Sequence, residues 1–283
     1  MATLPFVKMH GIGNDYVYVD AFTHQIADPA AFARRVSPRR TGIGSDGLIL
    51  IRPSELADCR MEMYNADGSR GAMCGNGIRC VGKYAFEHHL VRANPMRVET
   101  DSGIKLLHLT LRGSEVREVT VDMGAPILEG PAIPVAAVGR VVDAPLEVDG
   151  VAWRVTCVSM GNPHCVVFTS DVETLDVERL GPSFEHHPFF PARVNTEFVR
   201  VETPTLLRMR VWERGSGETA ACGTGACAAL VAAVLSGRAE RRATVRLNGG
   251  DLAIEWRESD GHVVMSGPAE EVFRGEIEVE VDA

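Results

Sequence analysis

The sequence lacks the features that would place the protein in a membrane, in the secretory pathway or on a nucleic acid. Its 283 residues contain no uninterrupted apolar run that could span a bilayer, and no basic segment followed by an apolar core begins the chain. The formal net charge of −9 argues against a nucleic-acid-binding surface. We therefore expect a cytoplasmic protein that binds neither a membrane nor a nucleic acid.

The signatures of common cofactors are also missing. Only three lysines occur, Lys8, Lys83 and Lys105, and none has the setting of a pyridoxal phosphate site. The sequence contains no Cys-x-x-Cys and no His-Glu-x-x-His that would indicate zinc. Its Gly-x-Gly pairs lack the third glycine and the strand–helix–strand context of a dinucleotide-binding loop. We expect neither a cofactor nor a metal.

Cysteine is the one reactive residue type whose pattern is informative. Seven cysteines in a long chain without a secretion signal favour free thiols over a disulfide framework. A free cysteine is most often a small buried apolar residue. We interpret five of the seven in this way: Cys59, Cys80, Cys157, Cys165 and Cys227.

The other two cysteines stand in duplicated stretches, Cys74–Gly77 and Cys222–Gly225. In each, the cysteine precedes Gly-x-Gly and an apolar run, which predicts a helix whose first turn is the glycine segment. The free N–H groups of such a turn bind a carboxylate and depress the pKa of a nearby thiol. The cysteines lie 222 − 74 = 148 residues apart, and the same offset relates Gly13-Asn14 to Gly161-Asn162. A repeat at one offset indicates two copies of one unit.

The apolar run Ala226–Leu235 has no polar face, so a helix there must be buried all round. Because strand-like patterns surround it, we predict an α+β fold of two pseudo-symmetric lobes. Each lobe would be a rolled mixed/antiparallel β-sheet wrapped around a central apolar helix. Residues 1–124 plus 268–283 would form the N-terminal lobe with Cys74, and 125–267 the C-terminal lobe with Cys222. The active site is expected between the lobes.

Two thiols beside anion-binding helix starts suggest a specific chemistry. An amino acid held there by its carboxylate would present its α-carbon to one sulfur on each side. A thiolate would remove the α-proton and a thiol on the opposite side would return one, which inverts the centre. The helix N–H groups would stabilise the negative charge of the carbanion.

Six stretches together closely resemble diaminopimelate epimerase. They occur in the order of that family and cover nearly the whole chain. They are Met9–Asp15, Asn65–Ser69, Met73–Cys80, Gly161–His164, Val194–Phe198, and Trp212–Gly215 followed by Ala221–Gly225. The resemblance implies a cofactor-independent epimerase of lysine and peptidoglycan-precursor biosynthesis. Such an enzyme interconverts LL- and meso-diaminopimelate, shares the two-lobed fold and is commonly a homodimer.

The resemblance also implies roles for single residues. Cys74 and Cys222 match the acid–base pair, and His164 and Glu213 match positions that tune the cysteines. Glu213 and Arg214 match the residues that grip the distal ammonium and carboxylate of the substrate. The expected substrate-binding residues are Asn14, Asn65, Gly75, Asn76, Asn162, Asn195, Glu213, Arg214, Gly223 and Thr224.

The sequence departs from the family pattern at two positions. Gly47 stands where some members have glutamine, which excludes a side-chain contact from that position. Phe273 stands where relatives often have tyrosine, at a position linked to dimer contacts.

Two other functions stay open at this stage. A racemase of the same fold could act on proline, hydroxyproline or histidine, although such a substrate has no use for Glu213 with Arg214. A thiol-based redox or metal-binding protein belongs to a different class. Thiol titration with metal analysis would distinguish it from an epimerase.

Overall fold

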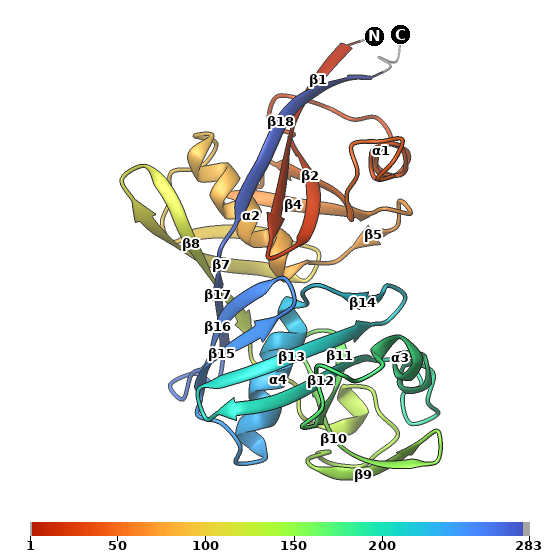
Figure 1. Ribbon diagram of the computed structural model, residues 1–283. Coiled ribbons are helices and arrows are strands. Elements are labelled where there is room, and N and C mark those ends of the chain that lie inside the picture. The colour runs from red at the N-terminus through yellow and green to blue at the C-terminus, as the bar shows by residue number, and fades with distance from the viewer. Residues whose placement is uncertain (1, 280–283) are drawn as a thin grey trace. The chain divides into compact units, whose positions relative to one another are not determined.

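The computed structural model describes residues 2–279 and divides into two compact units (Figure 1). One unit is Met1–Val121 with Gly267–Ala283, and the other is Asp122–Ser266. The lobes expected from the sequence, 1–124 plus 268–283 and 125–267, stay a prediction, and residues 1 and 280–283 lie outside the described part. Within that part, none of the helices combines the length and the apolar character that a membrane crossing requires.

The first unit is built from strands around one long helix. Strand β1 pairs antiparallel with both β2 and β18, β2 is parallel to β3, and β3 is antiparallel to β4. Strand β4 pairs with β5 and, in parallel, with β6, and β6, β7 and β8 form an antiparallel series. The elements are β1 (Ala2–Gly11), β2 (Asn14–Asp20), α1 (Pro29–Val36), β3 (Gly47–Arg52), β4 (Cys59–Asn65), β5 (Arg70–Gly71), α2 (Gly75–Glu87), β6 (Met96–Thr100), β7 (Gly103–Arg112), β8 (Glu115–Gly124, whose last residues belong to the second unit) and β18 (Glu270–Val279).

The second unit repeats this order of strand pairing. Strand β10 is antiparallel to β9 and β11, β11 is parallel to β12, and β12 is antiparallel to β13. Strand β13 pairs with β14 and, in parallel, with β15, and β15, β16 and β17 are antiparallel. The elements are η1 (Gly130–Ala132), β9 (Ala144–Val148), β10 (Val151–Ser159), β11 (Pro163–Phe168), α3 (Val177–Glu185), β12 (Asn195–Thr203), β13 (Leu206–Glu213), β14 (Gly217–Thr219), α4 (Gly223–Leu235), β15 (Arg242–Leu247), β16 (Gly250–Trp256) and β17 (Val263–Gly267).

The repeat inferred from the sequence is therefore confirmed in the strand pairing. The two central helices, α2 and α4, have 13 residues each and begin 223 − 75 = 148 residues apart. The predicted α+β class, with sheets rolled around a central helix, is confirmed as well.

Helix α4 is buried on all sides, as its composition predicts. It contacts strands β10 to β13, β15 and β16 of its own unit, and Leu230 and Val231 are fully buried. Complete burial of such a side chain contributes about 1.5–3 kcal/mol. Helix α2 is less apolar, and its buried Lys83 donates to Glu87 Oε1 at 2.8 Å and to the Val116 carbonyl oxygen at 2.9 Å. These packed helices give a rigid base to the turns at their N-termini.

Candidate active site

Each predicted catalytic cysteine is the N-cap of the central helix of its unit. Cys74 has φ −126° and ψ 121°, and its Sγ accepts from the Gly77 N–H at 3.3 Å. Cys222 has φ −124° and ψ 110°, and its Sγ accepts from the Gly225 N–H at 3.4 Å. The extended cap leaves the other N–H groups of the first turn directed out of the helix end, where they can bind an anion. The predicted helix starts are confirmed.

In the first unit, Cys74 lies among polar side chains. Its thiol donates to Asn14 Oδ1 at 3.2 Å, and Asn14 Nδ2 donates to Asp46 Oδ2 at 2.8 Å. The buried Tyr16 hydroxyl is within hydrogen-bonding reach of Cys74 and Asn14, and burial together with Cys74 and Asp46 raises the pKa of Tyr16 well above its ordinary value. Burial also raises the pKa of Asp46.

Buried Arg79 fixes the first turn of α2. Its guanidinium donates to the Gly75 carbonyl oxygen at 3.1 Å and to Asn76 Oδ1 at 3.0 Å. Its Nε donates to the Pro268 carbonyl oxygen at 3.1 Å. Gly75 and Asn76 are both buried in this turn. Arg79 is therefore a positioning residue that the sequence analysis did not single out.

Asn65 ends β4, where its Nδ2 donates to Ser69 Oγ at 3.0 Å. It pairs with Gly47 across strands β3 and β4. A Cβ at position 47 would collide with the Tyr64 carbonyl oxygen and lie 3.0 Å from Tyr16 Cε1. This backbone has no room for a side chain at Gly47.

In the second unit, a chain of hydrogen bonds runs from a buried carboxylate to Cys222. Glu197 Oε1 lies 2.7 Å from His164 Nδ1, and His164 Nε2 lies 3.1 Å from Asn162 Oδ1. Asn162 Nδ2 donates to Thr224 Oγ1 at 3.3 Å, and that hydroxyl lies 3.5 Å from Cys222 Sγ. Three of the predicted residues, His164, Asn162 and Thr224, are thus linked in one chain that ends at Cys222.

Glu213 is the last residue of β13 and Arg214 follows it, and their side chains have different hydrogen-bond partners. Glu213 Oε1 accepts from Thr219 Oγ1 at 2.5 Å, and burial raises the pKa of the Glu213 carboxyl. The Arg214 backbone N–H donates to Asn195 Oδ1 at 2.9 Å, and its guanidinium donates to the Ala192 carbonyl oxygen at 3.0 Å. Asn195 is therefore joined to the Glu213–Arg214 segment.

The surroundings of Cys222 favour the protonated thiol. Burial, followed by the charges of Glu213 and Glu197, raises the pKa of Cys222 well above its ordinary value. The Thr224 hydroxyl and the Gly225 N–H act in the opposite direction but do not outweigh them. Cys222 therefore carries its proton at neutral pH, before any substrate binds.

Sequence reasoning assigned no role to Tyr16, Asp46, Arg79 or Glu197. A signal for Glu197 was its place inside the Val194–Phe198 stretch, and in the structure it lies in a run of six buried residues, 194–199. For the other three, nothing in the spacing indicated a contact with Cys74 or with the first turn of α2.

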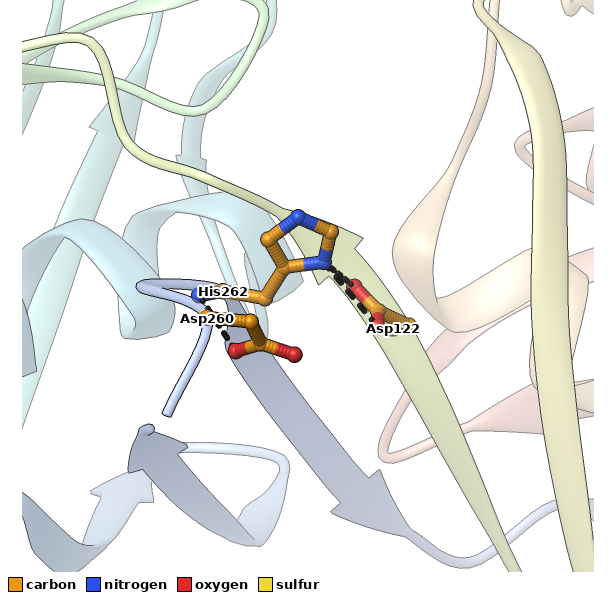
Figure 2. Close-up of side chains that lie close together, drawn as sticks. All are labelled: Asp122, Asp260 and His262. Atoms are coloured by element: carbon orange, nitrogen blue, oxygen red, sulfur yellow. Dashed lines mark hydrogen bonds and ion pairs between the residues drawn. The ribbon is translucent and has the colours of Figure 1, made fainter. Parts of the chain in front are cut away.

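A group of possible metal ligands in the described residues lies elsewhere in the second unit. Figure 2 shows Asp122, Asp260 and His262, whose ligand atoms lie within 4.8 Å of one another. His262 Nδ1 lies 2.9 Å from Asp122 Oδ1, and the Arg257 guanidinium lies 2.6 Å from Asp122 and 2.8 Å from Asp260. Because Arg257 already places a cation between the two carboxylates, we interpret the cluster as an ion-pair network.

Two solved structures with the same fold are distant from this chain in sequence. A phenazine biosynthesis protein of the PhzF family from Bacillus anthracis has a TM-score of 0.71 at 18% identity, covering 99% of this chain and 100% of its own. A hydroxyproline epimerase from Agrobacterium vitis has a TM-score of 0.69 at 16% identity, covering 98% and 91%. The chain thus has the two-unit α+β fold that these proteins share.

Sequence comparison identifies the family to which the chain belongs within this fold class. The model of the family described as diaminopimelate epimerase matches residues 6–129 and 156–272. Diaminopimelate epimerases from Acetivibrio thermocellus and Moorella thermoacetica are 55% and 57% identical to the chain, covering 97% and 96% of it and 98% of each relative. One from Methanococcus maripaludis is 51% identical, covering 98% of this chain and 100% of its own. The chain belongs to the diaminopimelate epimerase family.

Proposed function

We propose that the chain interconverts LL- and meso-2,6-diaminopimelate, in lysine and peptidoglycan-precursor biosynthesis. The observation that carries the proposal is the pair of cysteine N-caps, each at a glycine helix start. Family membership over nearly the full length supports the same substrate.

In the proposed mechanism, the α-carboxylate of the substrate binds to backbone N–H groups of both helix starts. Gly75 and Asn76 supply them in one unit, and Gly223 and Thr224 in the other. Cys74 and Cys222 act on opposite faces of the α-carbon, one as thiolate base and the other as thiol acid. The raised pKa of Cys222 favours its thiol form in the absence of substrate, which supports a role as the acid in the first turnover.

The remaining proposed roles concern the end of the substrate that does not react. Arg214 would bind the distal carboxylate and Glu213 the distal ammonium, since ion pairs of opposite sign suit the two groups. The amides of Asn14, Asn65, Asn162 and Asn195 would donate and accept neutral hydrogen bonds. Glu213 and His164 would also tune Cys222: Glu213 is within hydrogen-bonding reach of its sulfur, and His164 is linked to it through Asn162 and Thr224.

We also propose that the protein is a cytoplasmic homodimer. All seven cysteines lie in the described residues and are free thiols, which suits a reducing compartment. On strand β18, Phe273 is 44% exposed and the neighbouring Val272 55%, and Phe273 packs edge-on against Phe6 with ring centroids 6.0 Å apart. This apolar surface of the first unit suits contact with a second copy.

The test is α-proton exchange from deuterated water, followed by NMR on diaminopimelate, lysine, proline and histidine side by side. The parent chain should exchange and epimerise diaminopimelate, and Cys74→Ala and Cys222→Ala should abolish epimerisation. Cys59→Ala, which removes a buried thiol elsewhere, is the matched control and should stay active. Faster turnover of proline or histidine would replace this proposal by a racemase of the same fold.

A further inference from the structure

Arg79 of α2 is a fully buried cation beside the first turn of its own helix. Its Nη1 donates to the Gly75 carbonyl oxygen at 3.1 Å and to Asn76 Oδ1 at 3.0 Å, and its Nε donates to the Pro268 carbonyl oxygen at 3.1 Å. The direction of these bonds is fixed by chemistry, because a guanidinium keeps its charge in proteins and only donates. All three acceptors are neutral amide oxygens, so these bonds hold the guanidinium without cancelling its charge.

The end of strand β1 keeps the guanidinium in this place. Gly11 is the last residue of β1, and a Cβ there would lie 2.8 Å from Arg79 Nη2 and 3.0 Å from the Asn76 carbonyl oxygen. The backbone at Gly11 therefore packs directly against both groups. Because protein interiors are close-packed, the guanidinium has little room to move relative to the first turn of α2.

The bond to Gly75 connects Arg79 to one of the groups that hold the substrate in the proposed function. The Gly75 carbonyl and the Asn76 N–H belong to the same peptide group. A hydrogen bond from a cation to the carbonyl polarises that group, and the polarised N–H is a stronger donor. The Asn76 N–H is one of the groups proposed to bind the α-carboxylate. Arg79 thus acts on the carboxylate through one peptide group, without touching it.

We propose that Arg79 is a positioning residue that adds positive charge to the carboxylate-binding turn of α2, and that this charge stabilises the carbanion formed when the α-proton leaves. The catalytic part rests on the proposed function. The carboxylate is more negative in the carbanion than in the bound substrate, so a fixed cation favours the transition state over the ground state. Arg79 should therefore affect kcat more than KM.

The repeat shows that only one copy has this cation. The position equivalent to Arg79 is 79 + 148 = 227, where α4 carries the fully buried Cys227. A cysteine there supplies no guanidinium to the Gly223–Thr224 peptide group. At this position, the first turn of α2 has a permanent positive charge and that of α4 does not.

The first test uses the parent chain, labelled with ¹⁵N in arginine and studied by NMR. A guanidinium held by three hydrogen bonds should rotate slowly, so Arg79 should show separate signals for its two Nη atoms. Arg179, whose side chain is 64% exposed, is the control and should show one averaged Nη signal. An averaged signal for Arg79 would overturn the inference, whether or not the chain is an epimerase.

Two variants then separate charge from hydrogen bonding. Arg79→Lys keeps the charge, and Arg79→Gln keeps an N–H donor without it. Arg79→Gln should weaken the binding of acetate, a simple carboxylate followed through the Asn76 amide signal, by about two- to fivefold, the range for a charge at a helix end. It should lower kcat for diaminopimelate by about tenfold or more, and raise KM by less. A donor that touches the oxyanion directly contributes about 10²–10³. Arg79→Lys should recover part of both losses, and Arg179→Gln should show neither.

The outcomes separate this proposal from the proposed function. Equal losses in Arg79→Lys and Arg79→Gln, or a higher KM at unchanged kcat, contradict a role for the charge. Absence of epimerisation by the parent chain contradicts the proposed function, and the acetate titration then still shows whether Arg79 charges the turn. If Arg79→Gln does not fold, the Nη signals of the parent chain decide whether the guanidinium is held in place.

Discussion

Gly225→Ala tests how tightly side chains pack around Cys222, because Gly225 lies between that cysteine and the buried carboxylate of Glu197. A Cβ at position 225 would lie 2.6 Å from Glu197 Oε1 and 3.3 Å from both Cβ and Sγ of Cys222. Glu197 is held by His164 at 2.7 Å, so it cannot move without breaking that contact. Overpacking of this kind costs about 1–3 kcal/mol, and exchange of glycine for alanine within a helix returns about 1 kcal/mol.

The repeat supplies the control at the equivalent position. Gly77 lies three residues after Cys74, as Gly225 does after Cys222, and a Cβ there would lie 2.7 Å from Ile49 Cδ1 and 3.2 Å from Met61 Cε. Both atoms are the ends of flexible apolar side chains, which can shift at low cost. The helix-propensity gain of about 1 kcal/mol should then offset most of the contact in Gly77→Ala.

We therefore expect Gly225→Ala to be destabilised by up to about 2 kcal/mol relative to Gly77→Ala. Urea unfolding of the parent and both variants, followed by circular dichroism, measures the difference. Epimerisation should fall more in Gly225→Ala, because the displaced carboxylate disturbs His164 and hence Cys222. Equal midpoints, or a less stable Gly77→Ala, would refute the view that a rigidly held Glu197 fills this space.

Three further predictions concern charge and assembly. Burial raises the pKa of Glu213 above its ordinary value of 4.5 in the folded chain, so the folded state binds the proton more tightly and stability falls as pH rises from 4.5 through the raised value. Glu213→Gln should gain stability over the parent across that window while losing activity, and a parallel pH dependence of the two chains in thermal unfolding would contradict this. Arg214→Met should lower kcat/KM for diaminopimelate by an amount equivalent to about 3–5 kcal/mol of lost pairing if the site closes over the substrate, whereas Arg179→Met, an exposed control, should not. Phe273→Asp should yield monomers in light scattering, and Val138→Asp, at a 99% exposed apolar residue of the second unit, should leave the dimer intact.

What could be predicted from the sequence was local. The starts of α2 and α4 follow from Cys-Gly-x-Gly, because a cap and its first turn involve only neighbouring residues. The burial of α4 follows from its composition, because a helix without a polar stripe has no face for solvent. These two patterns account for the fold class and for both candidate catalytic residues.

What could not be predicted depends on side chains that meet from distant strands. Glu197 reaches His164 because β11 and β12 run parallel, with His164 in register with Asn195. Arg79 reaches Pro268 across 189 positions of the chain. No period or spacing in the sequence encodes such contacts, since they follow from the strand order.

The two helix starts have similar backbone conformations but different neighbouring side chains. Comparing positions 148 residues apart shows which side chains differ. Positions related by that offset carry Tyr16 and His164, Ile49 and Glu197, and Asn65 and Glu213. The three residues of the first unit include no carboxylic acid, whereas those of the second unit include Glu197 and Glu213. Glu213 and Glu197, with burial, hold the proton on Cys222. A two-thiol acid–base pair requires opposite protonation states. The raised pKa of Cys222 supports the proposal that Cys222 supplies the thiol of that pair.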